Sequence, residues 1–185
     1  MATFKINGKN FATQDGTGAA TIHSDVVFPA GHIIQVVTDS KSHSGDGISV
    51  SGSGATITNS SGYQLFNTAF TPKYSTSKII IQTSNVLVEE TSNNGNWGWL
   101  GAWYDTTNVA FVYSSPKYSH FSSNLNLAIH SLNHTFNSWG TTAKNINVRG
   151  GFNGAGYILH QSYDSQYPTS PSTQTVGLTI LEVMQ

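Results

Sequence analysis

The chain has 185 residues, of which 9% are charged and 37% hydrophobic, with a formal net charge of −1 and no cysteine. Eight basic residues spread along the chain exclude the clustered Lys and Arg of a nucleic-acid or anionic-membrane site, and the missing cysteines exclude a disulfide framework and a thiolate metal site. Aromatic residues at 11% argue against disorder, so we expect a lean core that relies on oligomerisation.

The N-terminal part predicts short strands and tight turns. Residues 3–6 (TFKI) alternate and end at Asn7-Gly8, a strong hairpin turn. Residues 21–28 form a second predicted strand, which Pro29-Ala30-Gly31 ends, and residues 32–38 (HIIQVVT) form a third.

One domain boundary follows from this pattern. We predict an N-terminal arm or anchoring strands over residues 1–28 and a β-sandwich over residues 29–185. The alternative, in which residues 1–28 supply ordinary edge strands to the same sandwich, stays open.

The rest of the chain predicts further short strands. Residues 41–47 read as a polar loop, and residues 149–151 (RGG) read as a turn. The strongest strand pattern covers residues 78–90, where the length predicts a bulge or bend near Ser84-Asn85. The other predicted strands cover residues 48–58, 62–70, 97–105, 109–113, 125–136, 144–149, 156–160 and 174–184. About ten to twelve strands and weak helical periodicity predict an all-β, jelly-roll-like antiparallel β-sandwich.

Catalysis needs titratable side chains held close together, and the sequence offers few. Glu89 and Glu90 are neighbours on a predicted strand, so they point to opposite faces and make a poor glycosidase pair. His130 and His134 form an H-x-x-x-H, but Ser131 stands where a zincin motif has Glu. On a strand these two histidines lie roughly 13 Å apart. We therefore expect no enzyme activity, no metal site and no cofactor.

Export and membrane insertion are not predicted either. No apolar run approaches the roughly 18 residues of a membrane span, and residues 1–15 lack the apolar region of a signal peptide. We expect the chain to be made and folded in a cytoplasm.

The aromatic strand over residues 97–105 is the best candidate for a binding surface. Trp97, Trp99 and Trp103 fall on one face of it. An exposed row of Trp rings can stack on sugars or on a partner chain. The alternative, which we favour because aromatic side chains are mostly buried, places this face in the core or in a trimer contact. Recognition loops rich in tyrosine add three more candidates, which are Tyr113, Tyr118 and Tyr163.

Three segments together resemble one group of proteins. They are residues 28–37 (FPAGHIIQVV), 70–81 (FTPKYSTSKIII) and 178–183 (LTILEV), with residues 104–110 (YDTTNVA) as a fourth candidate. The pattern is similar to short virion proteins of phages that infect aquatic bacteria, described as structural or tail-fibre-like. The likeness runs from about residue 28 to the end of the chain. It implies a β-sandwich that trimerises on the particle, with no catalytic residues to carry over.

The leading functional prediction is therefore a bacteriophage virion structural protein, displayed as a fibre, knob or capsid-decoration trimer that stabilises the particle or adheres to the host. Its arm would anchor through Phe4, Ile6 and Phe11. The expected partners are further copies of the chain, other capsid or tail proteins and a host cell-surface glycan. The alternative is a lectin-like receptor-binding module that uses the Trp face. A polysaccharide depolymerase is disfavoured because the carboxylates are scattered.

Overall fold

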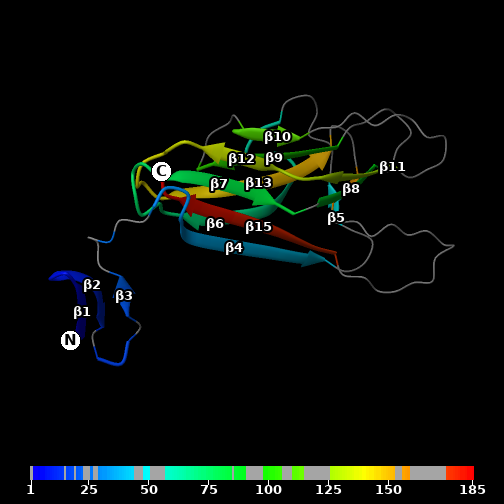
Figure 1. Cartoon of the computed structure of the whole chain (residues 1–185). Coiled ribbons are helices and arrows are strands. Elements are labelled where there is room, and N and C mark those ends of the chain that lie inside the picture. Colours follow the sequence, from blue (N-terminus) through cyan, green and yellow to red (C-terminus); the bar gives the residue numbers. More distant parts are fainter. Residues whose placement is uncertain are drawn as a thin grey trace.

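The computed structural model describes residues 2–14, 16–18, 20–22, 26, 29–43, 48–50, 57–84, 86–90, 98–105, 110–114, 126–152, 156–158 and 174–185 (Figure 1). Every regular element in these ranges is a strand, which confirms the all-β prediction. The strands are β1 (Ala2–Ile6), β2 (Lys9–Gln14), β3 (Thr21–Ile22), β4 (Ile33–His43), β5 (Ile48–Val50), β6 (Tyr63–Phe70), β7 (Lys78–Thr83), β8 (Val86–Glu90), β9 (Gly98–Tyr104), β10 (Val112–Ser114), β11 (Asn126–His130), β12 (Asn133–Phe136), β13 (Lys144–Phe152), β14 (Gly156–Ile158) and β15 (Gln174–Val183). In these ranges no helix is long and apolar enough to cross a membrane.

Two four-stranded antiparallel sheets form a jelly roll. One has the order β12-β7-β15-β4 and the other has the order β10-β9-β13-β6. Strands of the first half of the chain pair with strands of the second half as in a folded-over hairpin: β4 with β15, β6 with β13 and β7 with β12, while β9 pairs with β10 at the tip. This order is that of a jelly-roll sandwich and confirms the predicted fold class.

A third sheet, of order β11-β8-β14-β5, lies at the end of the sandwich away from the N-terminal strands (Figure 1). It begins where β7 stops at Thr83 and β8 starts at Val86. The strand predicted over residues 78–90 is therefore two strands of different sheets, divided at the position where a bulge or bend was predicted, and Asn85 itself lies outside the described residues. The predicted strand over residues 125–136 is two strands, because the chain leaves β11 at His130 and joins a different sheet as β12 at Asn133.

The core lies between the two main sheets and follows the period of two that each strand imposes. Val176, Leu178 and Ile180 of β15 are buried, as are Ile146 and Val148 of β13 in the facing sheet. The other buried members of this cluster are Leu65, Phe66, Phe70, Ile79, Ile81, Val86, Leu100, Ala102, Leu132 and Phe152.

Aromatic rings in contact extend this core. Phe111 lies 5.9 Å from Tyr104 and 5.0 Å from Phe136, measured between ring centroids, and Phe136 lies 5.2 Å from Trp139. Trp139 in turn packs edge to face against Phe70 of β6, at 5.9 Å. The Tyr104–Phe111 pair is stacked and the other pairs are edge to face, and both arrangements bring large apolar surfaces together with favourable ring contacts.

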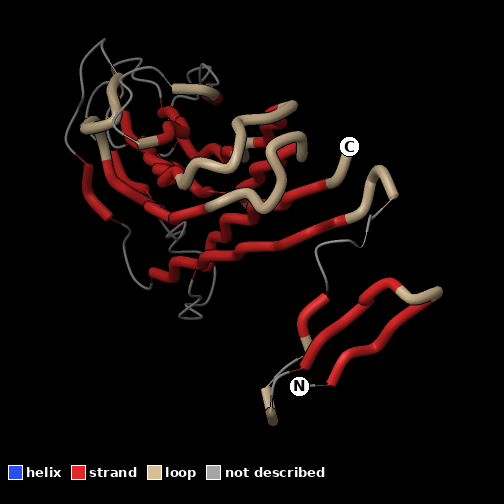
Figure 2. The backbone as a smooth tube through the Cα atoms, turned by 90° about the vertical axis from the view of Figure 1, so that its left-hand side faces the viewer, coloured by secondary structure: helices blue, strands red, loops and turns tan. Residues whose placement is uncertain are grey.

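The N-terminal strands form a separate small sheet of order β1-β2-β3. Both views show it standing apart from the sandwich, beyond the end where β4 begins (Figure 1, Figure 2). The predicted turn at Asn7-Gly8 closes the β1–β2 hairpin with φ of 50° and 77°. Strand β2 was not predicted, although residues 9–14 follow that turn directly. The strand predicted over residues 21–28 is described only as β3, Thr21–Ile22.

Two further predictions are wrong. The loop predicted over residues 41–47 is wrong for residues 41–43, because β4 continues to His43, paired with β15 as far as Gln174. Residues 44–47 lie outside the described residues. Lys41 supports this extension because its ammonium donates to the carbonyl of Gln64 at 3.2 Å and lies over the ring of Tyr63.

The predicted turn at Arg149-Gly150-Gly151 lies inside β13. Arg149 projects from the strand, and its guanidinium donates to the carbonyls of Ser61 and Gly62 at 2.7 and 3.0 Å. A third bond reaches Oε1 of Gln64 at 3.0 Å. Burial lowers the pKa of Arg149 from its ordinary value.

Candidate functional site

The N-terminal sheet is amphipathic. Phe4, Ala12 and Ile22 pair directly across β1, β2 and β3, so their side chains share one face, which Ile6 joins two residues beyond Phe4. Phe11 occupies the irregularity between Phe4 and Lys5 and packs edge to face on Phe4, with ring centroids 5.7 Å apart.

The opposite face of this sheet is polar. Thr3, Thr13 and Thr21 pair across the three strands, and Lys5 pairs with Asn10. A sheet with one apolar face normally rests that face on a core. Here the apolar face is open.

The three predicted anchoring residues are exposed to solvent on this face. Phe4 is 60% exposed and Ile6 50%, while Phe11 and Ile22 are exposed as well. No strand of this sheet has a buried residue. The structure therefore brings Phe4, Ile6 and Phe11 together on one small surface, which we call the arm face together with Ile22.

A second apolar surface lies on the outside of the β12-β7-β15-β4 sheet. Val36, Leu181 and Ile80 form one row across β4, β15 and β7, and Ile33 pairs with Val183 beside it. Ile33 is 54% and Val36 52% exposed. We call these five residues the outer patch. This patch was not predicted from the sequence, although four of the residues 33–37 are β-branched.

The Trp face is covered at Trp99 and Trp103, as the favoured alternative expected, and the sugar platform needs a correction. Trp99 and Trp103 are both 0% exposed and pack edge to face on each other, with ring centroids 6.2 Å apart. They lie on the side of β9 turned away from the core residues Leu100 and Ala102. A ring that stacks on a ligand must be accessible, so neither can serve as the predicted sugar platform.

Glycines make room for these two rings. A Cβ on Gly101 would lie 2.7 Å from the Trp103 ring, and one on Gly151 would lie 2.9 Å from the Trp99 ring. Gly62 also approaches Trp99 closely. The Trp103 ring therefore sits on the backbone of its own strand, and the Trp99 ring on the backbone at Gly151 of β13 and at Gly62 before β6, which is a structural role.

The other predicted binding residues are not placed as a site. The backbone of Tyr113 lies in β10. Trp97, Tyr118 and Tyr163 lie outside the described residues. A glycan surface built from them stays a prediction.

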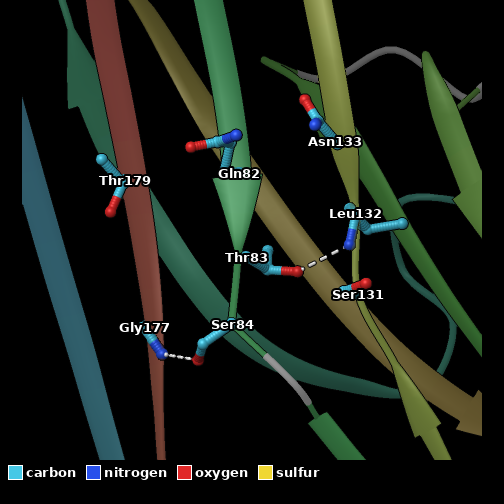
Figure 3. Close-up of a pocket in the computed structure, with 8 residues that line it drawn as sticks. All are labelled: Gln82, Thr83, Ser84, Ser131, Leu132, Asn133, Gly177 and Thr179. Atoms are coloured by element: carbon cyan, nitrogen blue, oxygen red, sulfur yellow. Dashed lines mark hydrogen bonds between the residues drawn. The ribbon is translucent and has the colours of Figure 1, made fainter.

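A polar pocket of about 400 Å³ opens where β7 parts from its two neighbours (Figure 3). It is lined by residues 82–84 at the end of β7, residues 131–133 before and at the start of β12, and Gly177 and Thr179 of β15. These lining residues present hydroxyl and amide groups and one leucine, with no acid, base or aromatic ring.

Hydroxyl groups in this pocket hold the strands together. Thr83 Oγ1 accepts from the backbone N–H of Leu132 at 2.8 Å, and Ser84 Oγ accepts from the N–H of Gly177 at 2.6 Å (Figure 3). The N–H groups of Thr83 and Ser84 donate back to the carbonyls of Leu132 and Gly177, both at 2.9 Å. Each pair thus continues the sheet where β7 bends away. A nucleophile with an adjacent base, which covalent catalysis requires, is not among these groups.

The two histidines considered for metal binding lie on different strands. His130 ends β11 and is buried, whereas His134 lies in β12 with its ring 4.5 Å from Phe136 and 5.3 Å from Phe111. Within the described ranges no three His, Asp or Glu side chains are grouped as a metal site.

The segments that carried the resemblance meet at one end of the sandwich. The carboxylate of Glu182 accepts from the backbone N–H of Lys73 and Tyr74, and Gln35 Nε2 donates to the carbonyl of Thr71 at 2.8 Å. These contacts join residues from all three segments into one structural junction, which binds backbone groups of the chain itself.

No protein-family model and no curated protein matches the chain. Among solved structures, it is similar to the VP2 subviral particle of infectious bursal disease virus, with 12% identity, 92% of this chain and 38% of that chain covered, and a TM-score of 0.38. The Gx strain of the same virus gives 13% identity, coverage of 100% and 50%, and a TM-score of 0.37. The chain thus spans half or less of the length of these two matches. At this level the likeness carries no argument about function.

Proposed function

We propose that the chain is a non-enzymatic structural subunit of a bacteriophage virion, which acts by packing against neighbouring subunits of the particle. The jelly-roll sandwich is the rigid body of this subunit, displayed on the particle surface as a trimer. The N-terminal sheet is its docking element, and Phe4, Ile6 and Phe11 are the residues that anchor it.

The open arm face is the observation that carries this proposal. A small sheet with no buried residue gains little stability from its own packing. Its amphipathic pattern nevertheless places four large apolar side chains on one surface. Fully burying a side chain of this size contributes about 1.5–3 kcal/mol, so docking on a partner supplies what the sheet lacks. An exposed apolar surface of this kind is typical of a protein interaction site.

Two other features support a role in assembly. The polar pocket presents hydroxyls that already bond to the backbone, and the Glu182 junction likewise serves the fold. The segments that resemble phage virion proteins form this junction, so the residues that carry the resemblance have a structural role. The resemblance supplies the setting, a phage particle, in which we place the subunit.

Labelling of intact particles tests the proposal. Antibodies raised against the purified chain should decorate the surface of phage particles produced by cells that express it, and the chain should co-purify with those particles through a density gradient. Substituting Phe4 by Asp should remove the chain from the particles while leaving the sandwich folded, as judged by thermal melts. A chain that never sediments with particles, or one that hydrolyses host capsule, would contradict the proposal.

A further inference from the structure

In the part of the chain that the structure describes, the exposed large hydrophobic side chains lie on two surfaces. Among the described residues, the large hydrophobic side chains that are exposed are Phe4, Ile6, Phe11, Ile22, Ile33 and Val36. The first four make up the arm face, and the last two lie in the outer patch. One chain therefore carries two open apolar sheet faces.

We propose that the arm face of one copy docks on the outer patch of a second copy. This inference rests on the proposed function and names the partner of its docking element. Two apolar sheet faces pack naturally on each other, as the two layers of a sandwich do. Joining them covers all six exposed side chains with one contact.

The scarcity of charged side chains around the arm face and the outer patch supports their contact with each other. The outer patch is bordered along the sheet by Thr38 and Thr179, which pair across β4 and β15. Among the described residues, the charged side chains beside the two surfaces are Lys9, opposite Ile6, and Lys78, opposite Val183. An acidic partner could pair only with these two lysines, whereas an apolar sheet face matches the larger, apolar part of both surfaces. The contact should therefore persist in 0.5 M salt, which screens the two lysines.

The turn at residues 29–32 directs the N-terminal sheet away from the outer patch of the same copy. His32 N–H donates to the carbonyl of Pro29 at 3.2 Å, while residues 31 and 32 exchange hydrogen bonds with Met184 at the end of β15. This turn sends the chain off the end of the sheet, and both views show the N-terminal sheet beyond that end, clear of the outer face (Figure 1, Figure 2). The arm thus projects to where a neighbouring copy can receive it.

Such a contact is head-to-tail, since each copy gives an arm and receives another. Head-to-tail contacts close into rings when the rotation between copies permits it. A ring of three would have the trimeric state proposed above.

Native mass spectrometry of the full-length chain tests the contact. The wild-type protein should run as a closed oligomer, near three times 19.9 kDa for a trimer. Phe4→Asp damages the arm face and Val36→Asp damages the outer patch, so each variant alone should be a monomer at the same concentration.

Mixing the two variants is the decisive step. The Val36→Asp copy keeps a sound arm and the Phe4→Asp copy keeps a sound patch, so an equimolar mixture should form a heterodimer near twice 19.9 kDa. No larger oligomer should form, because the free arm of this heterodimer carries Phe4→Asp and its free outer patch carries Val36→Asp. This outcome separates exchange between copies from docking within one copy, which gives no complementation.

Matched controls come from the same strands. Thr3→Asp places the same charge on the polar face of the arm, and Ser40→Asp places it on the outer face of β4, roughly 13 Å along the strand from Val36. Both should assemble like the wild type, and thermal melts should show all four variants folded.

Three results would overturn the inference. They are a monomeric wild-type chain, a Phe4→Asp variant that stays oligomeric, and a mixture that forms no heterodimer. None of them bears on antibody labelling of the particles, so the proposed function can stand if the arm instead docks on another virion protein.

Discussion

Glu182 and Lys73 are 109 positions apart in the chain, yet both carboxylate oxygens of Glu182 accept from the backbone N–H of Lys73 at 2.9 Å. The N–H of Tyr74 donates to the same carboxylate at 2.9 Å. Glu182 is completely buried on the inward face of β15. It therefore ties the closing strand to the connection between β6 and β7, and these two backbone donors satisfy a charge that would otherwise be costly to bury.

Replacing Glu182 by Gln should lower the free energy of unfolding. Gln keeps the size of the side chain but has one carbonyl oxygen, and its NH2 group turns a donor toward backbone donors. We expect a loss of about 1–3 kcal/mol, measured by urea denaturation. Asp105→Asn is the control, because that exposed carboxylate accepts one backbone N–H, from Asn145 at 3.0 Å, and should change stability less. Equal stability of Glu182→Gln and wild type would refute this role.

Gly62→Ala should be more damaging than an ordinary glycine substitution. Gly62 has φ of 62°, and a Cβ there would collide with the carbonyl oxygen of Gly150 and lie 2.8 Å from the Trp99 ring. Gly140→Ala isolates the backbone cost, since Gly140 has φ of 78° and open space around it. The control should lose about 1–2 kcal/mol, and Gly62→Ala should lose clearly more in the same melts. Similar losses of stability in the two variants would mean that the Trp99 ring and β13 shift easily to make room for the added Cβ.

The fold could be predicted from the sequence because its signals are local. Alternation predicted most strands, and the Asn7-Gly8 turn, the break between β7 and β8 and the closing strand over residues 174–184 all have counterparts in the structure. The jelly-roll class followed from the number and spacing of these strands.

The errors arose where distant contacts override local propensity. Gly150 and Gly151 have turn chemistry, but both are paired with β9 inside β13, and Gly151 leaves room for the Trp99 ring. Lys41 looked like part of a polar loop until its contacts with β6 became visible. Alternation also placed Trp99 and Trp103 on one face correctly, but it could not show that this face is covered.

Replacing Trp99 or Trp103 by Ala should test directly whether these side chains are buried. Removing a fully buried Trp costs about 3–5 kcal/mol through lost contacts and a cavity, so each variant should unfold at a much lower urea concentration. Phe4→Ala is the matched aromatic control. Its ring is exposed in the isolated chain, and its loss should change stability by less than about 0.5 kcal/mol in monomeric protein. Variants at Trp99 or Trp103 that stay fully stable but lose binding on a glycan array would restore the sugar-platform hypothesis.

Thr83→Val should loosen the point where β7 bends toward the third sheet. Val matches the shape of Thr but puts a methyl group where Thr83 Oγ1 accepts the N–H of Leu132, so this buried donor is left unpaired. We expect a loss of about 1–3 kcal/mol and faster hydrogen exchange at the Leu132 amide, measured by NMR. Thr135→Val makes the same change at an exposed position of β12 and should be nearly neutral. If both variants behave alike, the Thr83 hydroxyl does not hold β7 to β12, and the ladder bond from Thr83 N–H to the Leu132 carbonyl suffices by itself.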